Sequence, residues 1–243
     1  MAFSHNPKPV TDRGLIWIDA ANHVCYPGSG TTVYNLTEHS NQGSRILTTT
    51  PYMSGGTTWN SNGYWTFDGV NSVIYFGNLT YWSTNGNSLI NQMSIEYWQR
   101  GRGTTATTGT SPAHIGWTYG MDVFANASEL RYWVHDGSNS NYTRYVYESG
   151  VDIRDDNIWR QIVVIANGTR NKIYINGILK SNDAGTWPGT TNWHTNGLHF
   201  GRGNNNSMYF WKGDMGIFKM YGKELSADEV MQNFQAHRRR FGI

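Results

Sequence analysis

The sequence predicts an all-β protein that ends in one short helix. Short apolar segments alternate with polar residues at period two along the 243-residue chain, a pattern typical of half-buried strands. The 28 glycines and the repeated Asn-Gly and Asp-Gly pairs supply turns at hairpin spacing. One helix start signal stands out, close to the C-terminus. These patterns alone leave a sandwich, a barrel or a propeller open.

The N-terminal third predicts an arm followed by short strands. Residues 1–14 contain two prolines and no periodicity, so we expect an extended arm. Residues 15–19 form the first predicted strand. The runs 64–67 and 73–77 flank the turn pair Asp68-Gly69 at hairpin distance, which predicts a two-stranded hairpin.

The middle of the chain predicts longer strands. Residues 93–100 alternate cleanly, with Glu96 and Trp98 on the face opposite to Ile95, and we expect one of these faces to meet the core. The runs 114–117 and 130–134 predict neighbouring strands. The tyrosine-rich run 142–148 predicts one more strand.

The C-terminal third contains the clearest local signals. Residues 159–166 form a β-branched strand, and 172–179 form a hairpin around the turn pair Asn176-Gly177. Strands are also predicted at 198–201 and 213–221.

A helix is predicted over residues 226–237. Ser226 and Glu229 have the spacing of a capping box, in which each side chain bonds the backbone of the other. Leu225 and Val230 occupy the two positions of a hydrophobic staple. The run Arg238 to Arg240 places positive charge at the carboxyl end, where the helix dipole favours it.

Composition favours one turn-rich globular domain over residues 15–243. Aromatic residues make up 14% of the chain and charged residues 15%. The net charge of +2 and the basic residues, which are dispersed except for Arg238 to Arg240, argue against nucleic acid or a membrane as partner. The single Cys25 and an N-terminus without a signal-peptide pattern favour assembly in a reducing compartment, so we expect a protein that is not secreted.

Several motifs together resemble a known family, the laminin-G-like branch of the concanavalin A-like jelly rolls. They are residues 15–22, 26–32, 67–69, 93–98, 173–177, 198–202 and 213–221, with Leu225-Ser226 following. The resemblance implies two antiparallel sheets packed face to face, with carbohydrate held in many relatives on the concave face or its rim loops. The opening motif and residues 232–242 are most similar to versions in tailed-bacteriophage structural proteins.

An enzyme is not favoured. Glycosidases on this scaffold need two carboxylates about 5–10 Å apart. The corresponding strand offers Glu96 alone, with Ser94 and Trp98 at the positions two residues away. We expect Glu96 to pair with Arg100 or to be solvated.

Calcium is a second candidate, since relatives often bind it through Asp and Asn side chains. No run of acidic residues shows a recognisable ligand spacing, and we expect no cofactor, with Ca²⁺ as the alternative. The available carboxylates are Asp68, Asp122, Asp136, Asp152, Asp155, Asp156 and Asp214.

Aromatic side chains that stack on sugar rings, helped by polar neighbours, are the candidate carbohydrate site. Core packing is the competing interpretation for those on strands, and loop positions favour function more. The candidates are Trp117, Trp133, Tyr142, Trp187, Trp193 and His194. The candidate partner contacts are Arg238, Arg239 and Arg240, whose alternative role is to complement the helix terminus.

We therefore expect a non-enzymatic protein of a phage particle, a capsid decoration or tail protein made in the host cytoplasm. Its expected partners are other virion proteins, host or environmental glycans and further copies of itself. A free-standing lectin is the alternative, and a glycoside hydrolase is a weaker one.

Overall fold

The structure is a computed structural model of the whole chain. The residues that it describes are 7–37, 50–77, 92–103, 110–115, 121–125, 129–135, 142–148, 152–184, 198–202 and 209–243.

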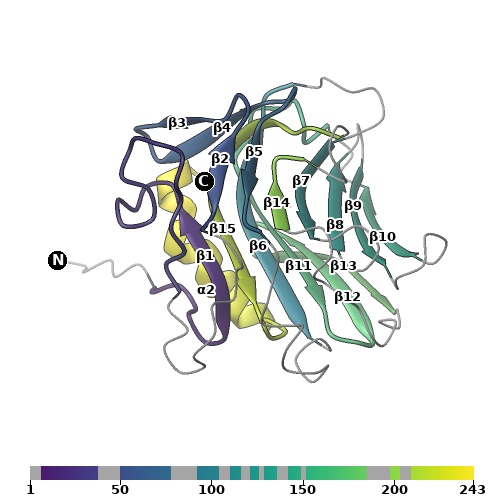
Figure 1. Cartoon of the computed structure of the whole chain (residues 1–243). Coiled ribbons are helices and arrows are strands. Elements are labelled where there is room, and N and C mark those ends of the chain that lie inside the picture. The colour runs from purple at the N-terminus through teal and green to yellow at the C-terminus, as the bar shows by residue number, and fades with distance from the viewer. Residues whose placement is uncertain are drawn as a thin grey trace.

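The described strands form two antiparallel sheets that pack face to face, so the predicted all-β sandwich is confirmed (Figure 1). The eight-stranded sheet has the order β13-β12-β11-β6-β15-β4-β3, with β1 also paired to β15. Its strands are β1 (Gly14–Asp19), β3 (Thr58–Asn60), β4 (Tyr64–Asp68), β6 (Met93–Gly101), β11 (Arg160–Ala166), β12 (Arg170–Ile175), β13 (Ile178–Ala184) and β15 (Lys212–Tyr221).

The seven-stranded sheet has the order β10-β9-β8-β7-β14-β5-β2. Its strands are β2 (Tyr52–Ser54), β5 (Val73–Tyr75), β7 (Thr110–Ile115), β8 (Met121–Ala125), β9 (Glu129–His135), β10 (Tyr142–Glu148) and β14 (Leu198–Phe200).

The main core lies between the two sheets. Phe200 of the seven-stranded sheet packs against Phe67 and Phe218 of the eight-stranded sheet, with ring centroids 5.9 and 5.1 Å apart. All three side chains are at most 1% exposed. This aromatic packing buries the apolar face of each alternating strand and holds the sheets in place.

The predicted hairpin turn at Asn176-Gly177 is confirmed. Both residues have positive φ, 52° and 78°, which is the backbone that a type I′ turn requires. The turn joins β12 to β13 at the edge of the eight-stranded sheet.

The predicted hairpin around Asp68-Gly69 is wrong. β4 pairs with β3 and β15, whereas β5 pairs with β2 and β14 in the other sheet. The Asp68 carboxylate accepts hydrogen bonds from the backbone N–H groups of Val70, Asn71 and Ser72. These bonds stabilise a compact turn that carries the chain from one sheet to the other.

The expectation that 114–117 and 130–134 are neighbouring strands is also wrong. β8 (Met121–Ala125) lies between β7 and β9 and pairs with both. Sequence reasoning missed this five-residue strand because it lies between polar, Gly- and Asn-containing segments that favour a loop.

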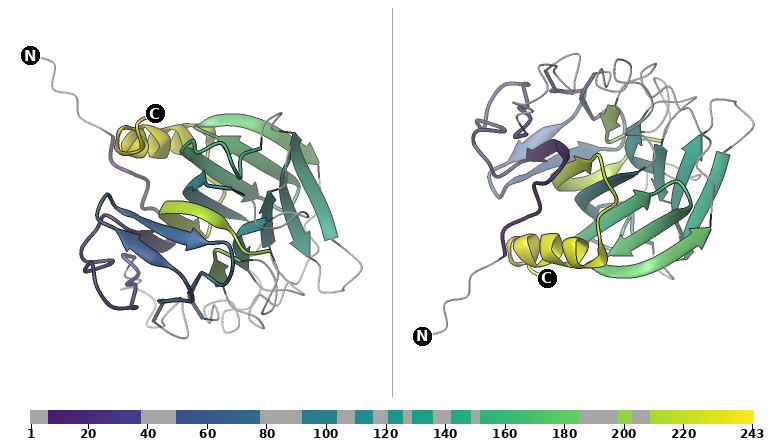
Figure 2. Two further views of the ribbon diagram at one scale, coloured as in Figure 1. Left: turned by 90° about the horizontal axis from the view of Figure 1, so that it is seen from above. Right: turned by 90° about the horizontal axis from the view of Figure 1, so that it is seen from below.

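The outer face of the eight-stranded sheet is covered by the C-terminal helix, α2 (Ala227–His237), as Figure 2 shows. The predicted capping box is present: the Ser226 hydroxyl accepts from the Glu229 N–H, and the Glu229 carboxylate accepts from the Ser226 N–H. Val230 of the helix is fully buried with Val163 and Tyr174 of the sheet. Because of this third layer, both faces of β6 are buried.

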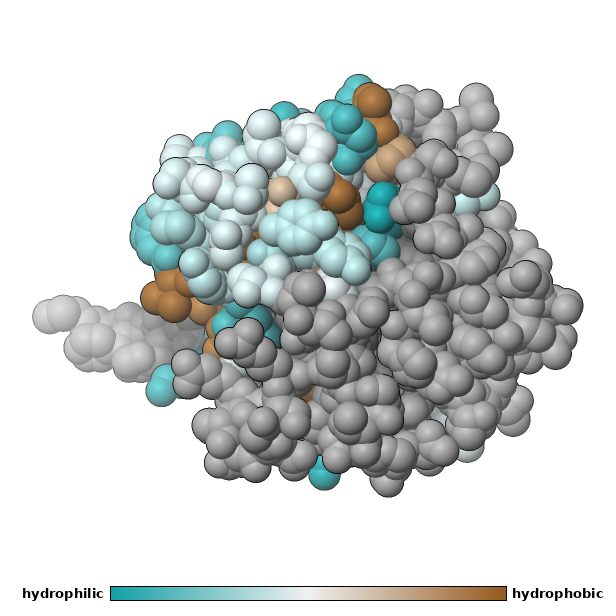
Figure 3. Space-filling model, viewed as in Figure 1, coloured by the Kyte–Doolittle hydropathy of each residue, from teal (hydrophilic) through white to brown (hydrophobic). Residues whose placement is uncertain are grey.

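The surface of the described residues is mostly hydrophilic in the view of Figure 3, with apolar groups in separate places. No helix in the described part of the chain is long and apolar enough to cross a membrane.

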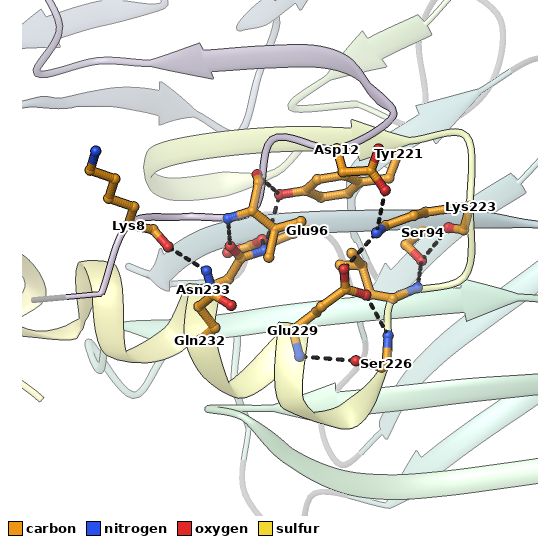
Figure 4. Close-up of polar contacts among 12 residues, drawn as sticks. Lys8, Asp12, Ser94, Glu96, Tyr221, Lys223, Ser226, Glu229, Gln232 and Asn233 are labelled. Atoms are coloured by element: carbon orange, nitrogen blue, oxygen red, sulfur yellow. Dashed lines mark hydrogen bonds and ion pairs between the residues drawn. The ribbon is translucent and has the colours of Figure 1, made fainter.

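A buried polar layer lies between α2 and the sheet (Figure 4). Asn233 donates to Glu96 Oε2 at 2.6 Å, and its own Oδ1 accepts from the Val10 N–H at 2.7 Å. Gln161 and Trp98 donate to the other carboxylate oxygen at 3.0 and 3.2 Å. Glu96 is therefore a structural residue, and the expectation that it pairs with Arg100 or is solvated is wrong.

The N-terminal residues 7–13 run along α2. Val10 is 8% exposed, and its carbonyl accepts from the Tyr221 hydroxyl at 3.2 Å. Lys223 binds both Asp12 and Glu229. This part of the expected arm is thus attached to the helix and to β15.

His237 of the same layer predicts a pH dependence of stability. Burial and the neighbouring Lys219 lower the pKa of His237 from 6.5 to about 3. Between these values the unfolded chain binds a proton that the folded protein does not, so stability falls as the pH drops through this window. We expect a loss of up to about 2 kcal/mol from His237 between pH 7 and pH 5.

The measurement is urea unfolding at pH 5 and pH 7. His237→Gln is expected to remove this part of the difference, since glutamine keeps an acceptor for the Lys219 ammonium, which lies 3.0 Å from His237 Nε2, and does not titrate. His23→Gln, at an exposed position, is the matched control. An unchanged pH difference in His237→Gln would contradict the assignment.

Candidate functional site

The outer face of the seven-stranded sheet is the candidate site. Its inner face is apolar: Ile74, Leu198, Phe200 and Leu130 are fully buried in the main core. Side chains alternate between the two faces of a strand, so the residues next to these belong to the outer face.

The strand register aligns one residue from each strand on this outer face. We call this line the outer row. It consists of Tyr52, Tyr75, His199, His114, Asp122, Trp133 and Arg144. The next line on the inner side is Met53, Ile74, Phe200, Ala113, Val123, Tyr132 and Tyr145. By register and strand alternation, aromatic, cationic and acidic positions are thus assigned to one face, and mostly apolar or aromatic positions to the other.

One end of the outer row is described in full. The rings of Tyr75 and His199 have centroids 4.9 Å apart, and those of Tyr52 and Tyr75 5.5 Å. Tyr52 is 43% exposed and His199 is 5% exposed. The three rings therefore form a continuous aromatic surface that reaches from solvent at β2 to a buried imidazole on β14.

Arg202 lies at the buried end of this surface. It follows β14 after Gly201, whose φ of 92° turns the chain and whose carbonyl accepts from the Trp211 N–H. The Arg202 Nη2 lies 3.1 Å from His199 Nε2. Because a guanidinium is only a donor, Nε2 is the acceptor and carries no proton in this contact.

Two predicted sugar-contacting residues lie on this same face. Trp133 is in the outer row on β9, and Tyr142 on β10 is two residues from the outer-row position Arg144, with which Trp133 is paired. The other four candidates, Trp117, Trp187, Trp193 and His194, lie outside the described residues. The register brings Trp133 and Tyr142 together on one face, although each was proposed separately.

The remaining outer-row residues were not predicted. His199 and Tyr75 sit between apolar neighbours in short strands, where alternation alone places them opposite the core. Within each strand, this alternation could have indicated that Tyr75 and His199 face away from the core. Which strands are adjacent depends on long-range pairing, and no local pattern reports it.

The predicted arginine run forms a 3₁₀ turn, η1 (Arg238–Phe241), after α2. Arg240 binds the Asp19 carboxylate and the Gly63 carbonyl, and Arg238 lies 5.9 Å from the Phe234 ring centre. Arg239 is exposed. Arg240 thus has a structural role within the chain.

Three of the candidate calcium carboxylates are paired with arginines in the described part of the chain, and Asp136 lies outside it. Asp214 is shared by Arg100 and Arg102, Asp152 binds Arg154, and Asp156 binds Arg160. No group of three or more His, Cys, Asp or Glu side chains among the described residues is arranged to hold a metal ion.

The sequence comparison decides the family. Residues 76–231 match the model described as the concanavalin A-like lectin/glucanases superfamily, laminin G type. The chain belongs to this superfamily. The predicted laminin-G-like jelly roll is thereby confirmed, and the phage association stays a prediction. No curated protein matches the sequence.

Solved structures share this lectin-like fold over nearly the whole chain. The receptor-binding domain of botulinum neurotoxin C/D mosaic serotype is 13% identical with a TM-score of 0.67, covering 93% of this chain and 52% of that one. Botulinum neurotoxin type C, whose cell entry depends on two ganglioside molecules, is 15% identical with a TM-score of 0.66, covering 93% and 51%.

The ligand-binding domain of botulinum neurotoxin serotype D, solved with N-acetylneuraminic acid, is 14% identical with a TM-score of 0.66. The match covers 92% of this chain and 51% of that one. The lectin-like chain spans about half the length of these structures, and at such identities the likeness shows the fold.

Proposed function

We propose that the protein is a non-enzymatic glycan-binding module that uses the outer face of its seven-stranded sheet. The observation that carries the proposal is the outer row, in which aromatic, His, Asp and Arg positions line up across seven adjacent strands. Aromatic faces stack on sugar rings, and the polar positions supply donors and acceptors for hydroxyl groups. Three solved neighbours named for ganglioside, receptor or sialic acid binding share the fold, which supports the proposal by analogy.

A non-enzymatic role fits the carboxylates. Glu96, the acid that a glycosidase on this scaffold would use, lies beneath α2 with its carboxylate bonded to Asn233, Gln161 and Trp98. The outer row contains one carboxylate position, Asp122, whereas hydrolysis with retention or inversion requires a pair.

The proposed setting is the surface of a phage particle, on the capsid or the tail. The similarity of the opening motif and of residues 232–242 to phage structural proteins supports it. A domain whose two sheets and terminal helix pack into one unit is suited to display, with other virion proteins as its partners. Mass spectrometry of purified particles tests this setting, and absence of the chain from them would overturn it. In that case, a free-standing lectin is the alternative.

Glycan-array binding of the isolated chain tests the binding function. Trp133→Ala is expected to weaken binding by about tenfold, the loss of one ring stacked on a sugar. Tyr142→Ala should weaken it in the same direction, since both residues belong to the outer face.

Tyr34→Ala is the control, because Tyr34 is an aromatic residue with 49% exposure outside both sheets. Its binding should equal that of the unmodified protein. Array binding that survives both Trp133→Ala and Tyr142→Ala would place the site elsewhere.

A further inference from the structure

Arg202 differs from the other arginines that are partly buried near the sheets. The partly buried Arg100, Arg160 and Arg240 each bind an Asp carboxylate, as do the buried Arg154 and the exposed Arg102, whereas Arg238 lies over the Phe234 ring beside the C-terminal helix. Within the described residues, the polar partner of Arg202 is the His199 ring, and no carboxylate contacts its guanidinium. A cation is thus held at the outer face without a counter-charge from the described part of the chain.

The Arg202 guanidinium is also partly removed from water. Its Nε–H is buried and has no hydrogen-bond partner among the described residues. Burial also lowers the pKa of the Arg202 guanidinium, although its ordinary value is so high that it stays charged. Arg202 is partly buried, so its guanidinium loses part of its hydration without gaining a counter-charge from the described residues, which is unfavourable, and a ligand that supplies a negative charge would offset that cost.

The side chains around Arg202 indicate the chemistry of a ligand that would pair with its guanidinium. The aromatic surface of Tyr52, Tyr75 and His199 leads from solvent to the guanidinium. A ring-shaped ligand stacks on such a surface, and an oxyanion on that ring reaches the planar donor fork of arginine, which matches carboxylate geometry.

We propose that Arg202 binds the oxyanion of an acidic glycan, a sugar bearing a carboxylate or a sulfate group. This inference rests on the proposed glycan-binding function and names its ligand class. Tyr52 and Tyr75 hold the sugar ring, and His199 orients the guanidinium through its Nε2 contact. Binding of the anion neutralises the charge that the described residues leave unpaired.

The test compares matched ligands by calorimetry. Tri-galacturonic acid and its methyl ester differ in charge and share one sugar backbone, and a sulfated galactose trisaccharide separates sulfate from carboxylate. The unmodified protein is expected to bind at least one acidic ligand about tenfold tighter than the methyl ester, the effect of one charge-assisted hydrogen bond. The preference should decrease as NaCl is raised.

Two variants at one position separate charge from packing. Arg202→Gln is expected to abolish the preference while it retains binding to the methyl ester, and Arg202→Lys should retain part of the preference. Arg170→Gln, at an exposed arginine on β12 of the other sheet, is the control and should behave like the unmodified protein. Thermal unfolding of each variant establishes that it is folded.

The outcomes distinguish this inference from the proposed function. Equal binding of acidic and neutral ligands, or a preference that persists in Arg202→Gln, would overturn the inference and leave glycan binding intact. If no glycan binds, the proposed function fails, and sodium glucuronate and sodium sulfate are then used as probes. A rise in Tm with either salt that is lost in Arg202→Gln supports an anion site, and no such rise overturns it.

Discussion

Replacing Asn233 with alanine is expected to lower the free energy of unfolding by about 3 kcal/mol. Asn233 is fully buried and bonds three groups: the Glu96 carboxylate, the Tyr221 hydroxyl and the Val10 N–H. Its removal leaves Glu96 Oε2 without the donor at 2.6 Å. The positively charged group that remains near this oxygen is the Lys219 ammonium, 3.9 Å away. The loss is larger than that of one exposed hydrogen bond because the affected groups cannot turn to water.

Gln232→Ala is the matched control for this prediction. Gln232 is the preceding residue of α2 and also bonds the N-terminal segment, donating to the Lys8 carbonyl at 2.7 Å. Because this bond is exposed, its loss should change stability by about 0.5 kcal/mol. Urea unfolding of both variants measures the difference. Equal effects would mean that the polar layer contributes no more than a surface contact.

Gly201→Ala is the second large expected effect, a loss of about 3 kcal/mol. The φ of Gly201 is +92°, and a Cβ there would lie 2.3 Å from the Phe67 ring, deep in the main core. The substitution combines backbone strain with overpacking, since Phe67 is held between the sheets. It should also displace the adjacent Arg202 and weaken binding of acidic glycans.

Gly30→Ala separates the two causes. Gly30 has a similar φ of +81°, but nothing lies within 4 Å of the added Cβ. Its expected loss of about 1 kcal/mol therefore reports backbone strain alone. Thermal or urea unfolding measures both variants. A Gly201→Ala loss no greater than that of Gly30→Ala would show that the core opens easily at Phe67.

Local patterns account for most of the strands and for the helix. The Asn176-Gly177 turn and the Ser226–Glu229 capping box were predicted because their residues satisfy the backbone within a few positions of the chain. The run 142–148 was predicted with the bounds that β10 has. The family resemblance then chose the sandwich among architectures that short strands leave open.

The errors have one physical origin. Asp68-Gly69 predicts a turn correctly, but whether the chain then returns to the same sheet depends on partners far along the sequence. The alternation of β6 predicts two faces, but it cannot report that α2 covers the second one. Glu96 therefore seemed solvated although it is fully buried.

Part of the candidate site could likewise be predicted from the sequence, and part of it depends on long-range strand pairing. Trp133 and Tyr142 were recognised from residue type and strand position, whereas the outer row exists only because β2, β5, β14, β7, β8, β9 and β10 are adjacent in that order. Arg202 belongs to the family motif 198–202, but nothing in the sequence indicated a binding role for it. Its significance comes from the contact with His199 and from the missing carboxylate among the described residues.

The amino-acid pattern was sufficient for the all-β class, the tight turns and the capped helix, because period-two alternation and backbone capping act within a few residues. Tertiary structure alone decided which faces are buried and which residues meet. Strand pairing joins segments distant in the chain, as in the outer row and the contact of Asn233 with Glu96 and Val10. That is why the all-β class could be predicted from the sequence pattern, while the arginine without a carboxylate partner among the described residues, Arg202, could be found only in the folded chain.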